Sequence, residues 1–438
     1  MAITQSERKP RSFIWTSLPW FIMAHFGHHL LTALPGPLLP AIRTEFNLNY
    51  TQSSFVTTAF ALAGGGAQLP SGWLADRIKP AVLIAMGTLG VAVGGILVGI
   101  SQTYIMLLVF LVIMGLMTGG YHPASTPLIL ASVDPNQRGR ALGFHLVGGN
   151  SSFFIAPLIA GPIMAAWGWR APFLVLAAPT AIFGLIFYIY LTRRGGKGHA
   201  DAARQRVAAE KPPQPGYKRR LIAYLTMMVL GGGAGMSVNA FLTLYMVDKL
   251  GASDAKAAML MSILYLPGIF GVPIIGGWIS DRIGSVKVII TTSIISGLII
   301  FGVKSFSLGF GFYAMLFIMG VNMAIRMPVT EVFIMSQTPA KRRSTIYGIY
   351  YFTMQYTGAI FAPIMGWFIQ KYTFSTMFTF SAYAVTAIAV GTSFFIWDAK
   401  DNYSSEPPAV PPRGEEMAKE AEEIKKVRDQ VRNPKRKR

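Results

Sequence analysis

Long apolar segments separated by short polar bursts run through most of the chain. Each apolar segment holds twenty or more residues, which is long enough for a helix to cross a bilayer. A water-soluble core has no need of this length so many times. We therefore expect twelve transmembrane helices, at residues 14–39, 52–75, 80–101, 104–132, 141–166 and 170–192, and then at 220–247, 257–280, 286–305, 309–335, 345–370 and 374–397.

The two halves of the chain repeat each other. The sequence Gly-Trp-Leu-Ala-Asp-Arg-Ile at 72–78 reappears as Gly-Trp-Ile-Ser-Asp-Arg-Ile at 277–283, and at the same spacing Gly115 matches Gly320. A membrane chain made of two matching halves is typical of transporters that rock one half against the other. The predicted fold class is an all-α membrane protein of two pseudo-symmetric six-helix bundles.

Polar segments divide the chain into five parts. A linker rich in Arg, Lys, Gly and Pro separates the halves, and a Pro-rich stretch followed by mixed charges comes after the last apolar segment. The predicted parts are a cytoplasmic N-terminus at 1–13, an N-terminal bundle at 14–192, a cytoplasmic linker at 193–219, a C-terminal bundle at 220–397 and a charged cytoplasmic tail at 398–438.

The charge distribution reports membrane topology. Of the 438 residues, 52% are hydrophobic and only 13% are charged, against about 25% charged in soluble domains. The net charge of +20 collects at the N-terminus, in the linker, in alternate loops and in the tail. This positive-inside bias predicts a multi-pass protein of the plasma or inner membrane with both termini in the cytoplasm. It does not indicate a nucleic-acid partner.

Composition and motifs argue against an enzyme. The chain contains no cysteine, which excludes disulfides, thiol catalysis and thiolate metal sites. It shows no nucleophile–base arrangement, no His-Glu-x-x-His and no phosphate-cradling loop, so ATP-driven transport is not expected either. The first apolar run is too long for a cleavable signal peptide. We expect a monomer in the lipid bilayer, with no catalytic residue, metal ligand or cofactor.

The repeated Gly-x-x-x-Asp-Arg loop resembles the signature loop of the major facilitator superfamily, over residues 12–397. In that family the loop latches the outward-facing state. The resemblance therefore implies latch roles for Asp76, Arg77, Asp281 and Arg282, with Glu331 as the partner of Arg282. The chemistry agrees, since a carboxylate can cap a helix N-terminus or pair with a cation.

A narrower resemblance lies in the fourth and fifth predicted helices. Tyr-His-Pro-Ala at 121–124 and His-Leu-Val-Gly-Gly-Asn at 145–150 are similar to the fosmidomycin-resistance branch of the superfamily. This similarity implies an exporter of small, often anionic or amphipathic compounds.

Five of the six histidines fall inside predicted helices of the first half. His25, His28 and His29 share one helix face through their i, i+3, i+4 spacing, and polar groups at this depth usually face a cavity or a partner. We expect His25, His28 and His122 to line the central cavity, because the first, fourth, seventh and tenth helices line it in the superfamily. His29 and His145 are expected to hydrogen-bond neighbouring carbonyls, which remains the alternative for the other three.

Arg326 lies well inside the tenth predicted helix, with Asn322 and Thr330 one turn away on the same face. An arginine at this depth costs at least about 2.5–3.5 kcal/mol. The alternative to a binding role is a salt bridge with Glu331. Five residues along a helix, however, separate the two side chains by roughly 140°. We therefore expect Arg326 to face the cavity and bind an anionic or strongly polar solute.

Two prolines support this location of the site. Pro123 and Pro328 occupy equivalent points of the two halves, where a proline removes a helical hydrogen bond, and interrupted helices at matched positions indicate the central site of a transporter. Asn239 and Gln355 are further candidate binding residues. For these two, and for Asn150, hydrogen bonding between helices is the alternative.

The scarcity of acidic residues in the first half limits which side chains could carry coupled protons. Before the linker the only acids are Glu7, Glu45, Asp76 and Asp134, none within a predicted helix core. Coupled protons would then pass through His25, His28 or His122, since histidine titrates near neutral pH, or travel with the anion.

The sequence therefore predicts a secondary transporter that moves a small anionic or amphipathic solute by alternating access, favoured as export by proton antiport. Two alternatives remain: proton-coupled uptake of a small organic anion such as a carboxylate, and a non-transporting receptor or scaffold on the same fold.

Overall fold

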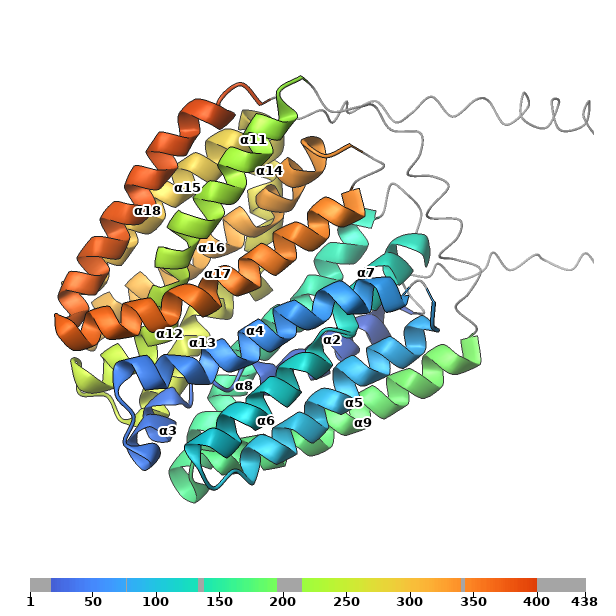
Figure 1. The fold of residues 1–438 in the computed structure, drawn as a ribbon, viewed down its shortest axis with the longest axis vertical. Helices are drawn as coiled ribbons and strands as arrows, with labels where there is room; N and C mark the ends of the chain where they lie inside the picture. The colour runs from blue at the N-terminus through green and yellow to red at the C-terminus, as the bar shows by residue number, and fades with distance from the viewer. Residues whose placement is uncertain (1–16, 76, 133–137, 195–214, 340–342, 400–438) are drawn as a thin grey trace, which may run out of the picture. The chain divides into compact units, whose positions relative to one another are not determined.

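The computed structural model describes residues 17–75, 77–132, 138–194, 215–339 and 343–399. In these ranges every regular element is a helix (Figure 1). Eight helices are long and apolar enough to cross a membrane, or nine when one bent pair is counted as a single span.

The first half forms six helical spans, as predicted. The fourth span is split into two helices, and a short helix follows the first span. The elements are α2 (Leu18–Thr32), α3 (Leu39–Phe46), α4 (Tyr50–Ala75), α5 (Pro80–Gly99), α6 (Tyr104–Thr118), α7 (Tyr121–Ser132), α8 (Arg138–Trp167) and α9 (Arg170–Arg194).

The second half also forms six spans. Its first span contains a π-helical turn, η3, and its second span is bent by 48° between two helices. The elements are α11 (Tyr217–Thr226), η3 (Met227–Gly232), α12 (Gly233–Asp248), α13 (Asp254–Ile269), α14 (Val272–Ile283), α15 (Ser285–Val303), α16 (Phe310–Ser336), α17 (Arg343–Lys371) and α18 (Phe374–Ile396).

The helix breaks differ from those expected at the two prolines. The fourth span is interrupted between α6 and α7, just before Pro123, but α16 runs through Pro328 without a break. The expectation for Pro328 is therefore wrong, because a membrane helix tolerates a proline when neighbouring groups satisfy the freed carbonyl. The second half breaks at Gly271 instead, whose φ of 77° favours glycine.

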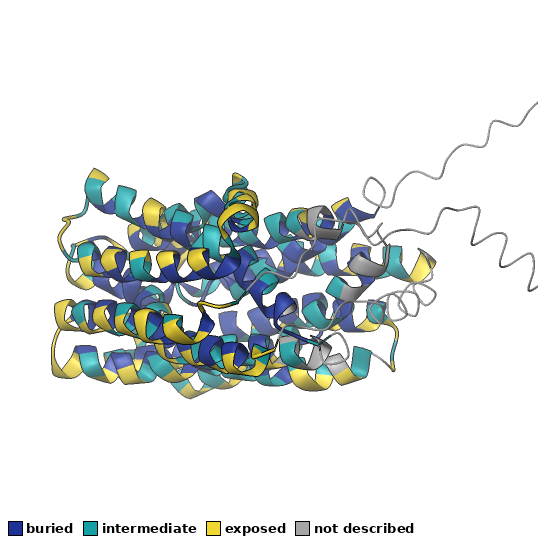
Figure 2. Cartoon of the chain, turned by 90° about the horizontal axis from the view of Figure 1, so that it is seen from above, coloured by how far each residue is buried: buried dark blue, intermediate teal, exposed yellow. Residues whose placement is uncertain are grey.

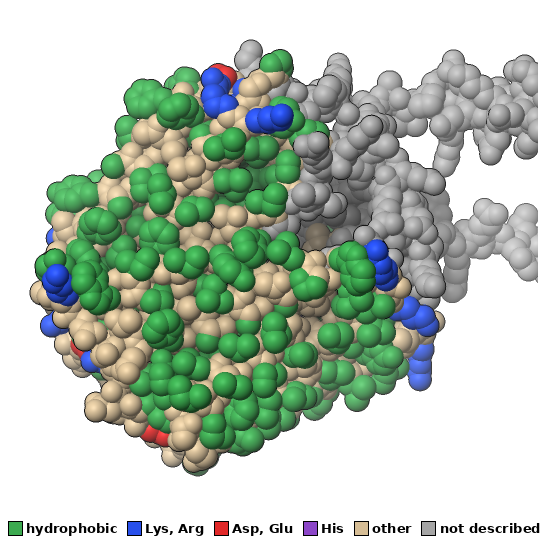
Figure 3. Space-filling view, viewed as in Figure 1, with side chains coloured by type: hydrophobic (Ala, Val, Ile, Leu, Met, Phe, Trp, Pro, Cys, Tyr) green, Lys and Arg blue, Asp and Glu red, His purple; other side chains and the backbone are tan. Residues whose placement is uncertain are grey.

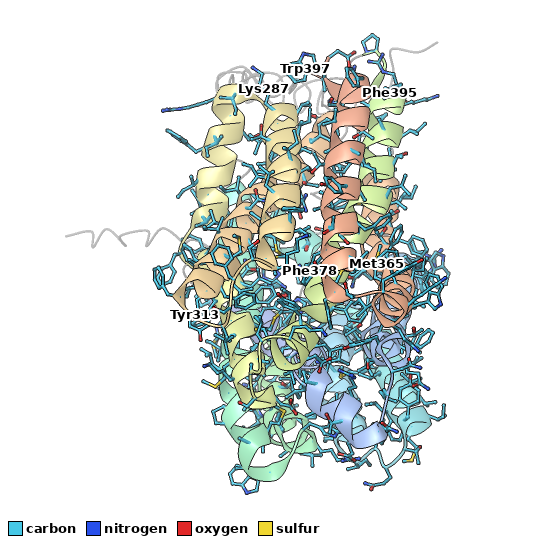
Figure 4. All side chains as sticks on the ribbon, turned by 90° about the vertical axis from the view of Figure 1, so that its left-hand side faces the viewer. Lys287, Tyr313, Met365, Phe378, Phe395 and Trp397 are labelled. Atoms are coloured by element: carbon cyan, nitrogen blue, oxygen red, sulfur yellow. The ribbon has the colours of Figure 1, made fainter. Side chains whose placement is uncertain are left out.

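The spans run between two ends of the molecule. At one end of the molecule α9 ends and α11 begins, and we call it the linker end. We call the opposite end the α3 end, after the short helix that lies there (Figure 1). Figure 4 shows Lys287, from the start of α15, near Trp397, which follows α18, whereas Phe378 lies toward the other end. Lys287 and Trp397 thus mark the linker end of the second half.

Among the described residues, one apolar cluster joins the two halves, and it reaches the α3 end. At the α3 end a single cluster contains Leu34 and Leu38 of the first half together with Phe241 and Leu244 of the second. At the linker end the first half has its own cluster around Phe21. The second half has another, around residues such as Phe333 and Ile334. Figure 2 shows buried residues in dark blue along the helices and exposed ones in yellow.

Polar contacts close the same end. Arg43 of α3 pairs with Asp248 at the end of α12, and the hydroxyl of Tyr50 donates to Asp248 Oδ2 over 2.7 Å. Thr243 Oγ1 also donates to the carbonyl oxygen of Gly36 over 3.1 Å. The structure therefore shows a state in which the halves are joined at the α3 end.

The outward-facing side chains are strongly apolar. Ile105, Leu298 and Phe394 have 65%, 67% and 78% of their surface exposed. On the face in Figure 3, hydrophobic side chains spread over the helices and charged ones stay near the margins. Soluble monomers rarely expose apolar patches of this extent, so this surface suits contact with lipid chains.

The repeat is visible in the helix packing. A Cβ added at Gly115 would lie 2.4 Å from the carbonyl oxygen of Phe60 on α4, and one added at Gly320 would lie 2.1 Å from that of Leu264 on α13. Small residues let membrane helices approach this closely. The two matched glycines thus make the same type of contact in each half.

Candidate solute-binding site

Arg326 on α16 lines a cavity of about 80 Å³ within the second half. Asn322 on the same helix and Asn239 on α12 line the same cavity. Its volume is enough for several water molecules. The described residues thus form a small, largely apolar cavity that contains a guanidinium, two amides and a hydroxyl.

The guanidinium of Arg326 has no ion-pair partner among the described residues. Its Nη1 donates a long hydrogen bond, 3.5 Å, to Ser293 Oγ. Glu331, the acid considered as its alternative partner, accepts a hydrogen bond from the Tyr351 hydroxyl over 2.7 Å. Because guanidinium groups carry five N–H donors, Arg326 keeps most of its donors for a bound molecule.

The two asparagines have different environments. Asn322 Nδ2 donates to the carbonyl oxygen of Thr292 over 3.0 Å and to Ser296 Oγ over 2.7 Å, which fixes its amide. Asn239 Nδ2 lies 3.7 Å from Met323 Sδ, and its Oδ1 is buried without a hydrogen-bond partner in the part of the chain described. The cavity therefore combines guanidinium donors with an unused amide acceptor.

Glycines of a π-helical turn and the following helix also line this cavity. Gly231 and Gly232 come from η3, and Gly235 lies one turn further along α12. Such π-helical turns occur frequently at functional sites. No sequence signal identified Ser296 or Met323 as lining residues.

Gln355 does not belong to this cavity. Its Cβ would lie 3.0 Å from a Cβ added at Gly65, so this part of α17 packs tightly on α4. Asn150 similarly lies against Gly268 of α13. Both residues sit where helices of the two halves meet, and a binding role for Gln355 stays a prediction.

The histidines of the first half form one cluster around α2 and α7. Ring centroids are 4.8 Å apart for His25 and His29, 5.2 Å for His25 and His122, and 5.4 Å for His29 and His122. His145 of α8 stacks on His25 at 4.1 Å. The face shared by the histidines of the first helix is thus confirmed. None of the cavity-lining residues around Arg326 comes from this cluster.

Two of the histidine assignments were wrong. His25 and His28, expected in the cavity, are buried with 3% and 1% of their surface exposed. Their Nδ1–H groups donate to the carbonyl oxygens of His145 over 2.8 Å and of Gly87 over 2.6 Å. These bonds draw both rings into the bundle. His29, expected against a carbonyl, is partly exposed like His122, and its Nδ1 lies 3.1 Å from Thr32 Oγ1.

The two latch loops make matching aromatic contacts. The guanidinium of Arg77 lies 3.7 Å from the centre of the Trp73 ring, and that of Arg282 lies 3.7 Å from the Trp278 ring. Cation–π contacts of this kind are typical of arginine on tryptophan. Asp76 lies outside the described residues.

The expected Arg282–Glu331 pair does not form. Arg282 is exposed on its tryptophan, whereas Glu331 is only partly exposed and bonded to Tyr351. Asp281 is exposed next to Arg282. The pair fails because Glu331 is directed toward α17 and Arg282 toward the surface.

Comparison with known proteins gives consistent matches. The family model described as the Major Facilitator Superfamily matches residues 21–251 and 223–434. The multidrug resistance protein MdtG of Proteus mirabilis (strain HI4320) is 27% identical over 398 residues, covering 86% of this chain and 95% of that protein. MdtG of Enterobacter lignolyticus (strain SCF1) is 25% identical over 328 residues, covering 73% and 77%.

Solved structures share the fold. A POT family transporter in complex with a thioalcohol-conjugated peptide superposes with a TM-score of 0.72 at 14% identity, covering 87% of this chain and 96% of that one. A bacterial homologue of the human lysosomal transporter Spinster, in an inward-facing and occupied conformation, gives a TM-score of 0.62 at 18% identity, covering 90% and 99%.

Proposed function

This chain belongs to the Major Facilitator Superfamily, and from that premise we propose that it exports a small anionic or amphipathic organic solute in exchange for protons. It is a multi-pass membrane transporter and not an enzyme. The proposal assigns solute binding to the second half and proton handling to the first.

The observation that carries the solute assignment is the environment of Arg326. Its guanidinium lines a cavity, and no carboxylate pairs with it among the described residues. A charge at this depth is costly without a partner, and an anionic group of the solute provides one. Asn239 Oδ1 adds an acceptor for a donor group on the same molecule.

Export is favoured by two observations. The relatives described above carry the name multidrug resistance protein, and the His-Pro and His-x-x-x-Gly-Asn patterns of 121–150 resemble the fosmidomycin-resistance branch. With the linker end in the cytoplasm, as the basic loops indicate, the state joined at the α3 end is the one that loads solute from the cytoplasm.

Proton coupling is assigned to the partly exposed histidines. The first half offers no carboxylate within a predicted helix core. His29 and His122 retain exposed surface, and histidine is the side chain whose ordinary pKa lies closest to physiological pH. His29 takes the place that the sequence had given to His25 and His28, since these two are sealed by carbonyl hydrogen bonds.

Transport in vesicles tests the proposal. Inverted vesicles with an inward-acid pH gradient should accumulate an anionic drug with wild-type protein, and right-side-out vesicles should not. Arg326→Gln should lower this accumulation at least about tenfold, as expected for a lost charge-assisted hydrogen bond. Arg326→Lys should retain part of the accumulation. Accumulation only in right-side-out vesicles would instead establish uptake by symport.

A further inference from the structure

Three histidines of the first half have the arrangement of a metal site. One ligand nitrogen from each of His25, His29 and His122 lies within 4.8 Å of the other two. Neutral imidazole is the commonest metal ligand in proteins. We propose that these three side chains bind one divalent transition-metal cation with the preferences of Zn²⁺.

The separations of the rings fit a shared cation. With Zn–N bonds of 2.0–2.1 Å, each ring centroid lies about 3.2 Å from the metal, and a tetrahedral arrangement places the centroids about 5 Å apart. The observed separations are 4.8, 5.2 and 5.4 Å. The ring separations are therefore compatible with one shared cation, and the ligand nitrogens must move closer together than 4.8 Å to reach bonding distance.

His25 is already in the tautomer that binds metal. Its Nδ1 lies 2.8 Å from the carbonyl oxygen of His145, and since a carbonyl only accepts, Nδ1 carries the proton. The lone pair is then on Nε2, which is buried without a hydrogen-bond partner among the described residues. A backbone carbonyl on the second ring nitrogen is the usual support of metal-binding histidines.

The local backbone explains how the ligands meet. His25 and His29 are four residues apart on α2, which places them on one face. His122 lies in the first turn of α7, directly after the break that follows α6. The break therefore sets the position from which His122 approaches the α2 pair.

The donor set selects the kind of cation. Three imidazoles and no carboxylate suit Zn²⁺ and its neighbours rather than Mg²⁺ or Ca²⁺. Three ligands leave a fourth tetrahedral position for water or an anionic group, and the partial exposure of His29 and His122 gives access to it. This inference concerns the first half alone and does not depend on the assignment of Arg326. Because a histidine must be deprotonated to bind a metal, the cation and the coupled protons compete for His29 and His122.

Cobalt titration tests the site directly. The full-length protein, purified in detergent without a polyhistidine tag and stripped with a chelator, is titrated with Co²⁺, whose tetrahedral complexes absorb intensely in the visible range. We expect one equivalent to bind and Zn²⁺ to displace it. His29→Gln and His122→Gln should each weaken binding at least about tenfold, since even outer-shell changes cost 10–100-fold.

His199→Gln is the matched control, because it removes a histidine of the predicted linker that is none of the three ligands. It should bind Co²⁺ as wild type does. No tetrahedral absorption from wild type, or an equal loss in His199→Gln, would overturn the proposal. X-ray absorption of the Zn²⁺-loaded wild type counts the imidazole ligands of the metal independently. We expect three imidazoles, and any smaller number contradicts the assignment.

Discussion

The two halves share one helical plan but have different polar interiors. The first half gathers histidines on α2, α7 and α8, and the second holds a guanidinium with amides on α12 and α16. His122 and Arg326 lie on the fourth and tenth spans, which are equivalent in the repeat. The duplication thus maintains the packing of the helices, while the polar groups divide the chemistry between the halves.

The largest effect, a loss of stability, is expected at the two matched glycines, where both halves pack their helices in the same way. Gly115→Val and Gly320→Val each force a side chain against a carbonyl oxygen of the neighbouring helix, 2.4 and 2.1 Å from the added Cβ. Overpacking costs typically about 1–3 kcal/mol, and backbone contacts lie at the upper end. Thermal unfolding in detergent should show a large and similar loss for both. Gly391→Val, where nothing lies within 4 Å, is the control and should unfold like wild type.

Smaller effects are expected at the polar residues, where a substitution in the first half should change proton flux and one in the second half should change solute affinity. His122→Gln is expected to lower coupled proton flux about tenfold while leaving the affinity for solute nearly unchanged. Arg326→Gln should lower the affinity itself, because the guanidinium lines the cavity. Proton flux and solute binding are measured on both variants in liposomes. If coupled flux is undiminished in His25→Gln, His28→Gln, His29→Gln and His122→Gln alike, protons do not pass through the cluster.

The smallest effect, a shift in the balance between transport states, is expected at the α3 end, where the halves are joined. Arg43→Gln and Asp248→Asn remove the ion pair between α3 and α12. Partly exposed pairs of this kind are worth about 1 kcal/mol or less, so the balance between the two transport states should shift only a few-fold. Labels on the α3 end, followed by distance measurements, should report a modest gain of the state open at that end. An unchanged distribution in both variants would remove the pair from the gating machinery.

The fold was accessible from the sequence because it follows from repeated simple signals. Apolar length located the spans, and the duplicated loop located the two halves. The sequence pointed to Arg326 through the cost of burying a guanidinium, and to Asn322 through its place one turn away on the same helix face. It gave Asn239 only as a further candidate, with hydrogen bonding between helices as the alternative.

The sequence did not predict the contacts between residues on different spans. Helical spacing places His25, His28 and His29 on one face, but it does not show which rings meet a carbonyl of α5 or α8. The same reason separates Glu331 from Arg282, since the hydroxyl of Tyr351 on α17 accounts for the carboxylate. Gln355 packs closely against Gly65 of α4, and this contact has no signature in local sequence.

The most direct test of the central claim is a binding measurement at Arg326. Purified wild-type protein, screened by thermal shift against small anions and drugs, should be stabilised by at least one anionic compound. Arg326→Gln should lose that stabilisation and Arg326→Lys should keep part of it, while both unfold near the wild-type temperature without ligand. Equal stabilisation of wild type and Arg326→Gln by every anionic compound that binds would contradict the account.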